Sequence, residues 1–196
     1  MTRPLFDTSA VAAAIYWSTL LGWFVIEFRQ GRHERREATE QDQGSRNVIR
    51  TTMVIGIFVA VQLARRVPGA HVHGSRVTVF VVALAIMWAG MALRFSAFRT
   101  LGDYFTFTVQ TSAQQQVITA GPYRVIRHPS YAGGVLILAG VGLALGNWLS
   151  LAANLVIPLI GVINRIEVEE RALRATLGDA YASYASQRKR LVPYLW

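Results

Sequence analysis

Five long apolar stretches set the strongest limit on what this chain can fold into. They cover about residues 8–28, 48–64, 77–95, 131–146 and 148–163. A membrane-spanning helix needs roughly 17–25 such residues, so each of the first three stretches predicts one crossing. Only Asn147 separates the last two, which predict a tight helical hairpin. Because 53% of the residues are hydrophobic and 16% are charged, charges are too few to cover a soluble globule. We expect an all-α integral membrane protein with about five transmembrane helices.

A secretory signal peptide is the alternative interpretation of the first stretch. It is less favoured, because the charges follow the apolar run and no short apolar core with a cleavage site is evident. Cysteine is absent, which excludes disulfides, thiolate nucleophiles and thiolate metal sites.

The basic residues predict the orientation in the membrane. Sixteen of the 20 fall in the loop after the first stretch, in the segment after the third, and in the tail. The other side carries Arg3, Arg65, Arg66 and Arg76. By the positive-inside rule this predicts an outside N-terminus and a cytoplasmic C-terminus. The net charge of +9 then reflects topology and lipid headgroups. We expect no nucleic-acid partner, because no basic stretch is interleaved with aromatic residues.

The segment between the third and fourth apolar stretches, residues 96–129, is too polar to cross the membrane. Residues 105–109 alternate between apolar side chains and threonine, which predicts extended backbone, and Gly121-Pro122 predicts a turn. Non-helical backbone near a bilayer is tolerated only where protein covers it or where it lines a cavity. The segment is therefore a candidate to build a pocket.

Two polar clusters flank the predicted hairpin. The first, Gly121–Gly133, places two arginines, a histidine and two tyrosines at the mouth of a span, which suits an anionic headgroup or a zwitterionic cofactor. An interfacial belt of tyrosine and arginine is an equally good interpretation. In the second, Arg165–Glu170, Arg165 and Glu169 are four residues apart and share a helix face. A salt bridge at the helix exit explains this pair unless a partner faces it across a pocket.

Taken together, the clusters resemble a known family. The patterns are Gly-Pro-Tyr-x-x-x-Arg-His-Pro-Ser-Tyr-x-Gly and Arg-x-x-x-Glu-Glu-x-x-Leu-x-x-x-Leu-Gly-x-x-Tyr-x-x-Tyr. They resemble the isoprenylcysteine carboxyl methyltransferases and their prokaryotic relatives, over about Phe105–Pro193. The resemblance implies an integral membrane methyltransferase of a prokaryotic cell membrane, with its active site on the cytoplasmic side. It also implies an S-adenosylmethionine pocket and a lipophilic or prenylated acceptor that enters from the membrane lipids.

The same resemblance assigns roles to individual residues. It implies cofactor contacts at Gln110, Gln115, Gln116, Val117, Ile118, Tyr123, Arg127, His128, Pro129, Ser130, Tyr131 and Glu169. It implies that Arg165 engages the carboxylate of the acceptor, and that Arg165 and Glu169 carry the reaction. The chain departs from the eukaryotic pattern at Gln115, where those members have histidine, and the gap from Gln110 is shorter.

Elementary chemistry agrees with these roles. Methyl transfer is an in-line displacement, so positioning matters more than proton transfer, and an acceptor carboxylate is already ionised near neutral pH. An arginine such as Arg165 binds carboxylates bidentately. The aromatic faces of Tyr123 and Tyr131 suit a sulfonium by cation–π attraction, and Glu169 suits the ammonium or hydroxyl groups of the cofactor.

The chain then divides into residues 1–95, three spans that form a scaffold and a possible acceptor tunnel, and residues 96–196, the catalytic region. The favoured acceptor is a carboxylate, and a lipid amine or thiol stays open. An NADPH-dependent reductase of the sterol-reductase type is the alternative function. Its tail is echoed by Tyr181, Tyr184, Arg190 and Pro193. The chain is short for that group, and a non-catalytic scaffold is a third possibility.

Three further features have simpler explanations. His71 and His73 have no third ligand nearby and do not predict a metal site. Gly142-x-x-x-Gly146 predicts close helix packing. The charged run Arg32–Asp42 predicts a solvated loop.

Overall fold

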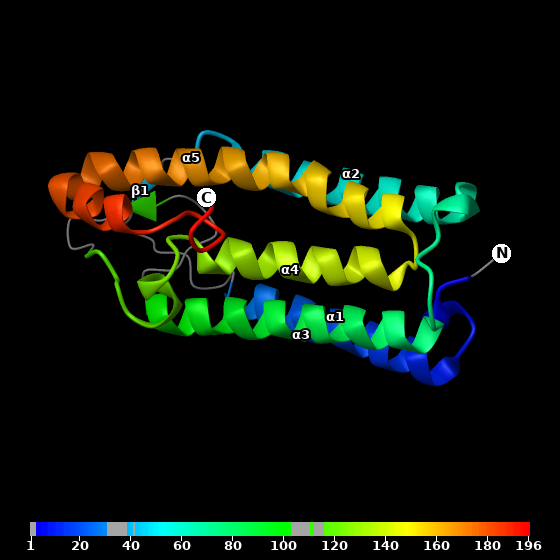
Figure 1. Ribbon diagram of the computed structural model, residues 1–196. Coiled ribbons are helices and arrows are strands. Elements are labelled where there is room, and N and C mark those ends of the chain that lie inside the picture. The colour runs from blue at the N-terminus through cyan, green and yellow to red at the C-terminus, as the bar shows by residue number, and fades with distance from the viewer. Residues whose placement is uncertain (1–2, 31–38, 41, 103–109, 112–115) are drawn as a thin grey trace.

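The computed structural model describes residues 3–30, 39–40, 42–102, 110–111 and 116–196. Within these residues five long helices run along one common direction (Figure 1). They are α1 (Ala10–Gln30), α2 (Ser45–Arg66), α3 (Arg76–Leu101), α4 (Pro129–Ala144) and α5 (Trp148–Gln187). Short 3-10 helices are η1 (Leu5–Asp7), η2 (Pro68–Ala70) and η4 (Gly121–Arg124), and the two-residue strands β1 (Thr39–Glu40) and β2 (Gln110–Thr111) pair antiparallel.

The predicted all-α membrane fold is confirmed. Among the described residues, four helices are long and apolar enough to cross a membrane: α1, α2, α3 and α5. The fifth, α4, has 16 residues and spans roughly 24 Å. It lies in the centre of the bundle, between α3 and α5.

Two of the helices extend further than their apolar stretches. The third helix continues to Leu101, and the last continues from the apolar residues into the charged segment and reaches Gln187, with a kink at Gly178. Charged residues such as arginine and glutamate are good helix formers, so the end of an apolar run marks the membrane boundary and not the end of the helix. At Gly178 the φ of 52° and ψ of −129° are not helical, and the helix axis changes direction there.

The helices pack in pairs, α2 along α5 and α3 along α4, with small residues at the contacts. A Cβ atom on Gly90 would lie 2.6 Å from the carbonyl oxygen of Gly133, and one on Gly56 would lie 2.8 Å from the ring of Pro158. Glycines allow helices to approach closely where the lipid environment gives little hydrophobic drive for association. Met87 and Ile137 are fully buried between α3 and α4.

The hairpin between α4 and α5 forms as predicted. The side chain of Asn147 accepts a hydrogen bond from the backbone N–H of Ser150 (3.0 Å), which caps α5, and donates to the carbonyl of Val67 (2.8 Å). Gly142 is the packing position expected of it, with a Cβ there reaching 2.9 Å from the Cα of Leu151. The packing prediction is wrong for Gly146, which instead takes a φ of 68° in the turn and has no such neighbour.

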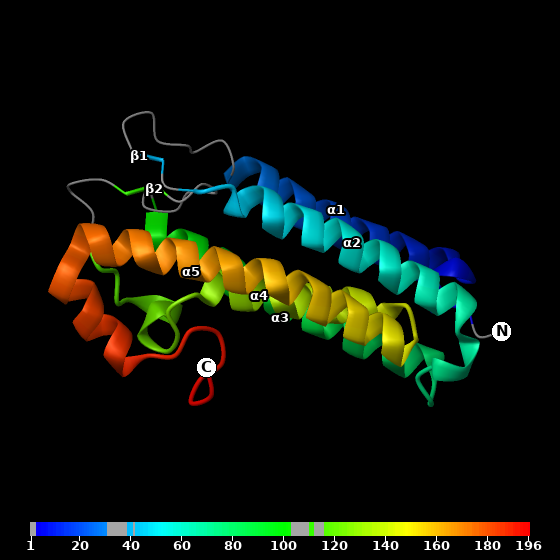
Figure 2. The ribbon, with the colours of Figure 1, turned by 90° about the horizontal axis from the view of Figure 1, so that it is seen from above.

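The first helix stands partly apart from the others. Figure 2 shows α1 and α2 on the same side of the layer formed by α3, α4 and α5, and Figure 1 shows them separated from each other. Helix α1 contacts η1 and α3.

Candidate active site

The two polar clusters meet beside the first turn of α4. The hydroxyl of Tyr131 donates a hydrogen bond to Oε2 of Glu169 (2.8 Å) and accepts one from Nε of Arg165 (3.2 Å). A hairpin brings the start of its first helix beside the later part of its second, so residues far apart in the sequence become neighbours. The tyrosine of the first motif thus bridges both predicted catalytic residues of the second.

The backbone of the first cluster is fixed by its prolines and by the C-terminal tail. Pro122 and Pro129 lie in the first turns of η4 and α4, where a missing N–H costs no hydrogen bond. The N–H groups of Arg127 and His128 donate to the carbonyls of Lys189 (2.8 Å) and Arg190 (3.0 Å). The C-terminal tail therefore fixes the segment before α4 by backbone hydrogen bonds.

Glu170 is the centre of a buried ionic cluster. Its side chain accepts hydrogen bonds from Nε2 of His128 (3.1 Å) and Nη2 of Arg190 (3.0 Å), and it pairs with Nη1 of Arg127 (3.1 Å). The glutamate is only 3% exposed. Sequence reasoning singled out Glu169 and missed Glu170, although both belong to the Glu-Glu pair of the motif. Arg127 and His128 are thus held by the protein itself, and their predicted contact with a cofactor stays a prediction.

Arg165 is likewise buried, at 3% exposure, and its charge is balanced within the chain. Its Nη1 donates to Oγ of Ser45 (2.7 Å) and pairs with the carboxylate of Asp42. Asp42 also accepts a hydrogen bond from the backbone N–H of Arg46 (3.1 Å). Arg165, which is predicted to bind the acceptor, therefore already holds a carboxylate, that of Asp42 just before α2.

The prediction of a solvated loop is wrong for Asp42, which is 7% exposed. The guanidinium of Arg165, the hydroxyl of Ser45 and the backbone N–H of Arg46 stabilise this carboxylate in the interior. Burial by itself raises the pKa of Asp42, but the hydrogen bond from Arg46 and the charge of Arg165 outweigh it and hold the pKa below its ordinary value. Residues 32–38 and 41 of the same run lie outside the described residues.

A second ion pair supports the first turn of α4 from the opposite side. Nη1 of Arg94 donates to the carbonyl of Ser130 (2.8 Å), and Nη2 donates to Oε2 of Glu27 (2.8 Å). The indole N–H of Trp23 donates to the other oxygen of Glu27 (3.0 Å). Sequence reasoning used Arg94 only for topology; an arginine and a glutamate inside two apolar helices were the signal for this pair.

Other predicted residues lie near this centre or outside the described part of the chain. Tyr123 is buried, and its backbone carbonyl accepts a hydrogen bond from the Tyr184 hydroxyl (2.8 Å). The ring centroids of Tyr181 and Tyr184 lie 6.1 Å apart. Pro129 and Ser130 are buried at the start of α4.

The predicted cofactor run before η4 is only partly described. Gln116 is exposed, and Val117 and Ile118 are half-buried. The backbone of Gln110 pairs with Glu40 in the β1–β2 ladder. The side chain of Gln110, all of Gln115 and the predicted alternation at 105–109 lie outside the described residues.

Comparison with known proteins identifies the family. The family model described as phospholipid methyltransferase matches residues 78–180, more than half of the chain. The chain belongs to the phospholipid methyltransferase family. The matched range contains the first polar cluster, the hairpin and the second cluster, which are the parts that converge on Tyr131.

Relatives within this family carry isoprenylcysteine methyltransferase names. Protein-S-isoprenylcysteine O-methyltransferase B of Arabidopsis thaliana is 31% identical over 114 residues, covering 57% of this chain and 58% of the relative. The Schizosaccharomyces pombe enzyme is 30% identical over 115 residues, covering 58% of this chain and 49% of the relative. These matches confirm the resemblance predicted from the motifs.

A solved structure supports the fold. The eukaryotic intramembrane Ras methyltransferase ICMT aligns with a TM-score of 0.58 and 25% identity, covering 76% of this chain and 52% of that chain. The present chain thus spans about half the length of the relatives it matches.

Proposed function

We propose that this chain is an integral membrane methyltransferase that transfers a methyl group from S-adenosylmethionine to a carboxylate on a lipophilic acceptor. The observation that carries the proposal is the convergence of Arg165, Tyr131 and Glu169 through one hydroxyl group. The family match and the isoprenylcysteine methyltransferase relatives support the same reaction class.

The residues present fit the cofactor. When bound, S-adenosylmethionine supplies a methyl group on a positively charged sulfur. The side chain of Glu169 is 30% exposed and has acceptor capacity for the cofactor's ammonium or hydroxyl groups. Nε of Arg127 is buried without a hydrogen-bond partner among the described residues, and such a donor suits the cofactor's carboxylate. The ring of Tyr131 lies in the same cluster and offers a face to the sulfonium.

We propose that the carboxylate of the acceptor takes the place of Asp42 on Arg165. A guanidinium that already binds one carboxylate in a buried setting has the geometry to bind another. The two carboxylates then compete, so Asp42 tunes how strongly the site binds its acceptor.

The charge distribution supports a proposed orientation in the membrane. Arg3, Arg65 and Arg76 lie at the end of the bundle remote from Arg165, as the two described pockets there indicate. The positive-inside rule then favours a cytoplasmic active site, in contact with the compartment that holds the water-soluble cofactor. We propose a prokaryotic cell membrane as the location, with membrane lipids and a prenylated or other lipophilic acceptor as partners.

We further propose that residues 1–95 form the scaffold and part of the acceptor path, and that residues 96–196 form the catalytic region. The first region also reaches into the second. Glu27 supports Arg94, and Asp42 and Ser45 hold Arg165. Its role is therefore to position the site as well as to enclose it.

Methylation of a lipid amine is the second candidate. It is favoured by the balanced charge of Arg165, because a site that is already neutral suits an uncharged nucleophile. A sterol-type reductase is not favoured. The residues that echo its tail have structural roles here: Tyr184 holds Tyr123, and Arg190 holds Glu170.

The test uses the purified protein in lipid nanodiscs with isotope-labelled S-adenosylmethionine. The candidate acceptors are a farnesylated cysteine carboxylate, its methyl ester and phosphatidylethanolamine. We expect label in the free carboxylate and its release as methanol by alkali, since esters are base-labile. Base-stable label on phosphatidylethanolamine would show that the acceptor is a lipid amine and not a carboxylate. Binding of NADPH without binding of S-adenosylhomocysteine would reject both forms of the proposal.

A further inference from the structure

A large groove opens at the end of the bundle remote from Arg165. Its walls are α1 and α2, its floor is α4, and its volume is about 1060 Å³. Figure 1 shows the separation of α1 from α2. This volume is at the upper end of the roughly 300–1,000 Å³ of ordinary small-molecule pockets, so the groove has room for a large ligand.

The walls of the groove are apolar over a length that matches one leaflet. Trp17, Leu21 and Phe24 of α1 line it and are 59%, 64% and 66% exposed. On α2 the lining runs from Ile57 to Arg65, which is roughly 12 Å of helix. Half of the hydrocarbon core of a bilayer is roughly 15 Å thick. An acyl chain therefore matches the space between α1 and α2 in length and chemistry.

The mouth of the groove is basic. Arg3, Arg65 and His71 line it, together with one acid, Asp7. Neither Arg3 nor Arg65 has an ion-pair partner among the residues that the structure describes. Two arginines and one acid thus line the mouth, which leaves it with an excess of positive charge.

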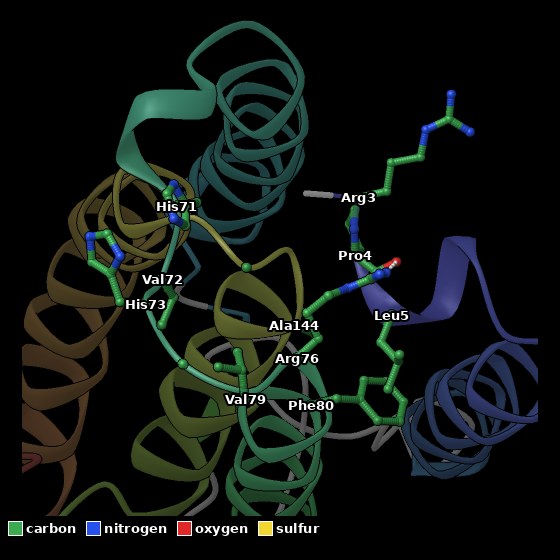
Figure 3. A pocket seen from close by; sticks show the side chains of 12 residues that line it. Arg3, Pro4, Leu5, His71, Val72, His73, Arg76, Val79, Phe80 and Ala144 are labelled. Atoms are coloured by element: carbon green, nitrogen blue, oxygen red, sulfur yellow. Dashed lines mark hydrogen bonds between the residues drawn. The ribbon is translucent and has the colours of Figure 1, made fainter. Parts of the chain in front are cut away.

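A smaller pocket of about 150 Å³ adjoins this mouth and shares Arg3 and His71 with it (Figure 3). Figure 3 shows Arg3 on the N-terminal segment and His71 on the chain between α2 and α3. The guanidinium of Arg76 donates to the carbonyl of Pro4 (3.1 Å) and to the hydroxyl of Thr8 (2.6 Å). These hydrogen bonds hold the N-terminal segment, including Arg3, beside the mouth of the groove.

We propose that this groove binds one anionic phospholipid of the outer leaflet, with its phosphate between Arg3 and Arg65 and an acyl chain between α1 and α2. Basic pockets between transmembrane helices recognise anionic headgroups in this way. The bound lipid fills the space between α1 and α2. The site lies at the opposite end from Arg165 and does not depend on the proposed methyltransferase activity.

The experiment is native mass spectrometry of the purified full-length protein with phosphatidylglycerol or phosphatidylcholine of identical acyl chains. The wild type should retain one phosphatidylglycerol in preference to phosphatidylcholine. The variant Arg65→Gln should weaken that retention about fivefold, since one arginine near a headgroup contributes roughly that factor. Arg66→Gln is the matched control: it removes the same charge from the adjacent residue, which lines neither the groove nor the small pocket.

A second variant tests the wall of the groove. Val61→Trp fills the space between α1 and α2 and should lower the retention of both lipids, while a thermal unfolding temperature close to that of the wild type shows that the variant is folded. Equal loss of phosphatidylglycerol in Arg65→Gln and Arg66→Gln would overturn the site, and so would equal retention of the two lipids by the wild type. Displacement of phosphatidylglycerol by the farnesylated cysteine would assign the groove to the acceptor and also overturn the proposal.

Discussion

Two adjacent glutamates on α5 sit in opposite kinds of surroundings. Glu170 is buried and holds three basic side chains, those of Arg127, His128 and Arg190. Glu169 has a side chain that is 30% exposed, and its one hydrogen bond to a described residue comes from Tyr131. A carboxylate saturated by the protein has no capacity left for a ligand, whereas a partly satisfied one does. The comparison separates a structural carboxylate from a candidate binding group within a single turn of helix.

The largest effect should come from the structural carboxylate. The variant Glu170→Gln leaves the charges of Arg127 and Arg190 without their buried partner, and breaking a buried ion pair in this way costs roughly 3–5 kcal/mol. We expect a large fall in the thermal unfolding temperature of the protein in detergent, with loss of cofactor binding as a consequence. Glu167→Gln on the exposed face of the same turn is the control and should unfold like the wild type. An unchanged unfolding temperature for Glu170→Gln would remove the distinction.

The variant Glu169→Gln should lose ligand affinity and keep its stability, the opposite of Glu170→Gln. It keeps the size of the side chain but loses the charge, and a hydrogen bond to a charged group contributes roughly 1.5–3 kcal/mol. Affinity for S-adenosylhomocysteine should therefore fall roughly tenfold to a hundredfold, while the unfolding temperature changes little. Isothermal titration and thermal unfolding measured on the same preparation distinguish the two glutamates. Binding that equals that of the wild type would show that Glu169 is not a cofactor ligand.

These two glutamates also show how far sequence reasoning extends. Apolar length and Asn147 predict the hairpin, and the hairpin alone brings the motif of Tyr131 to the motif of Glu169. The partners of Glu170 were not predicted, because Arg190 lies in a tail without periodicity and looked like part of a reductase signature. Its contact with Glu170 depends on the kink at Gly178, which turns the end of α5 back toward α4.

The contact between Asp42 and Arg165 could not be predicted from the sequence, for a different reason. Asp42 lies in a charged run with no apolar pattern, and such runs usually face water. Arg165, however, follows an apolar stretch, and a guanidinium buried there needs an acid to balance its charge. That requirement predicts that some carboxylate lies nearby. It does not choose among the eleven acidic residues of the chain.

A moderate effect is expected from Asp42→Asn, which tests the competition for Arg165. If the acceptor carboxylate displaces Asp42, the variant should show a KM for the farnesylated cysteine that is severalfold lower, with kcat and S-adenosylhomocysteine affinity close to those of the wild type. Steady-state kinetics over a range of acceptor concentrations gives this result directly. A higher KM would mean that Asp42 orients Arg165 and stays in place during turnover. Asp179→Asn, an exposed change on α5, is the control.

A smaller effect, on turnover, is expected from Tyr131→Phe. The ring remains for cation–π contact, but the hydroxyl that joins Arg165 to Glu169 is lost, and such a hydrogen bond contributes roughly 0.5–1.5 kcal/mol. Activity should fall by about two- to tenfold through kcat. Tyr194→Phe, at a residue that is 94% exposed, should leave activity unchanged. A loss confined to KM for the acceptor would place Tyr131 in acceptor binding instead.

The smallest effect concerns acid stability and again compares Asp42 with its control. The pKa of Asp42 is lowered in the folded protein, with burial opposing the shift and Arg46 and Arg165 producing it. A lowered folded pKa means that this stabilisation is complete above the unfolded pKa of about 3.9 and is lost as the pH falls through the folded pKa. The thermal unfolding temperature of the wild type should therefore fall more steeply below about pH 4 than that of Asp42→Asn. Asp179→Asn should follow the wild type, and identical curves for all three proteins would show that the Asp42–Arg165 pair does not stabilise the fold.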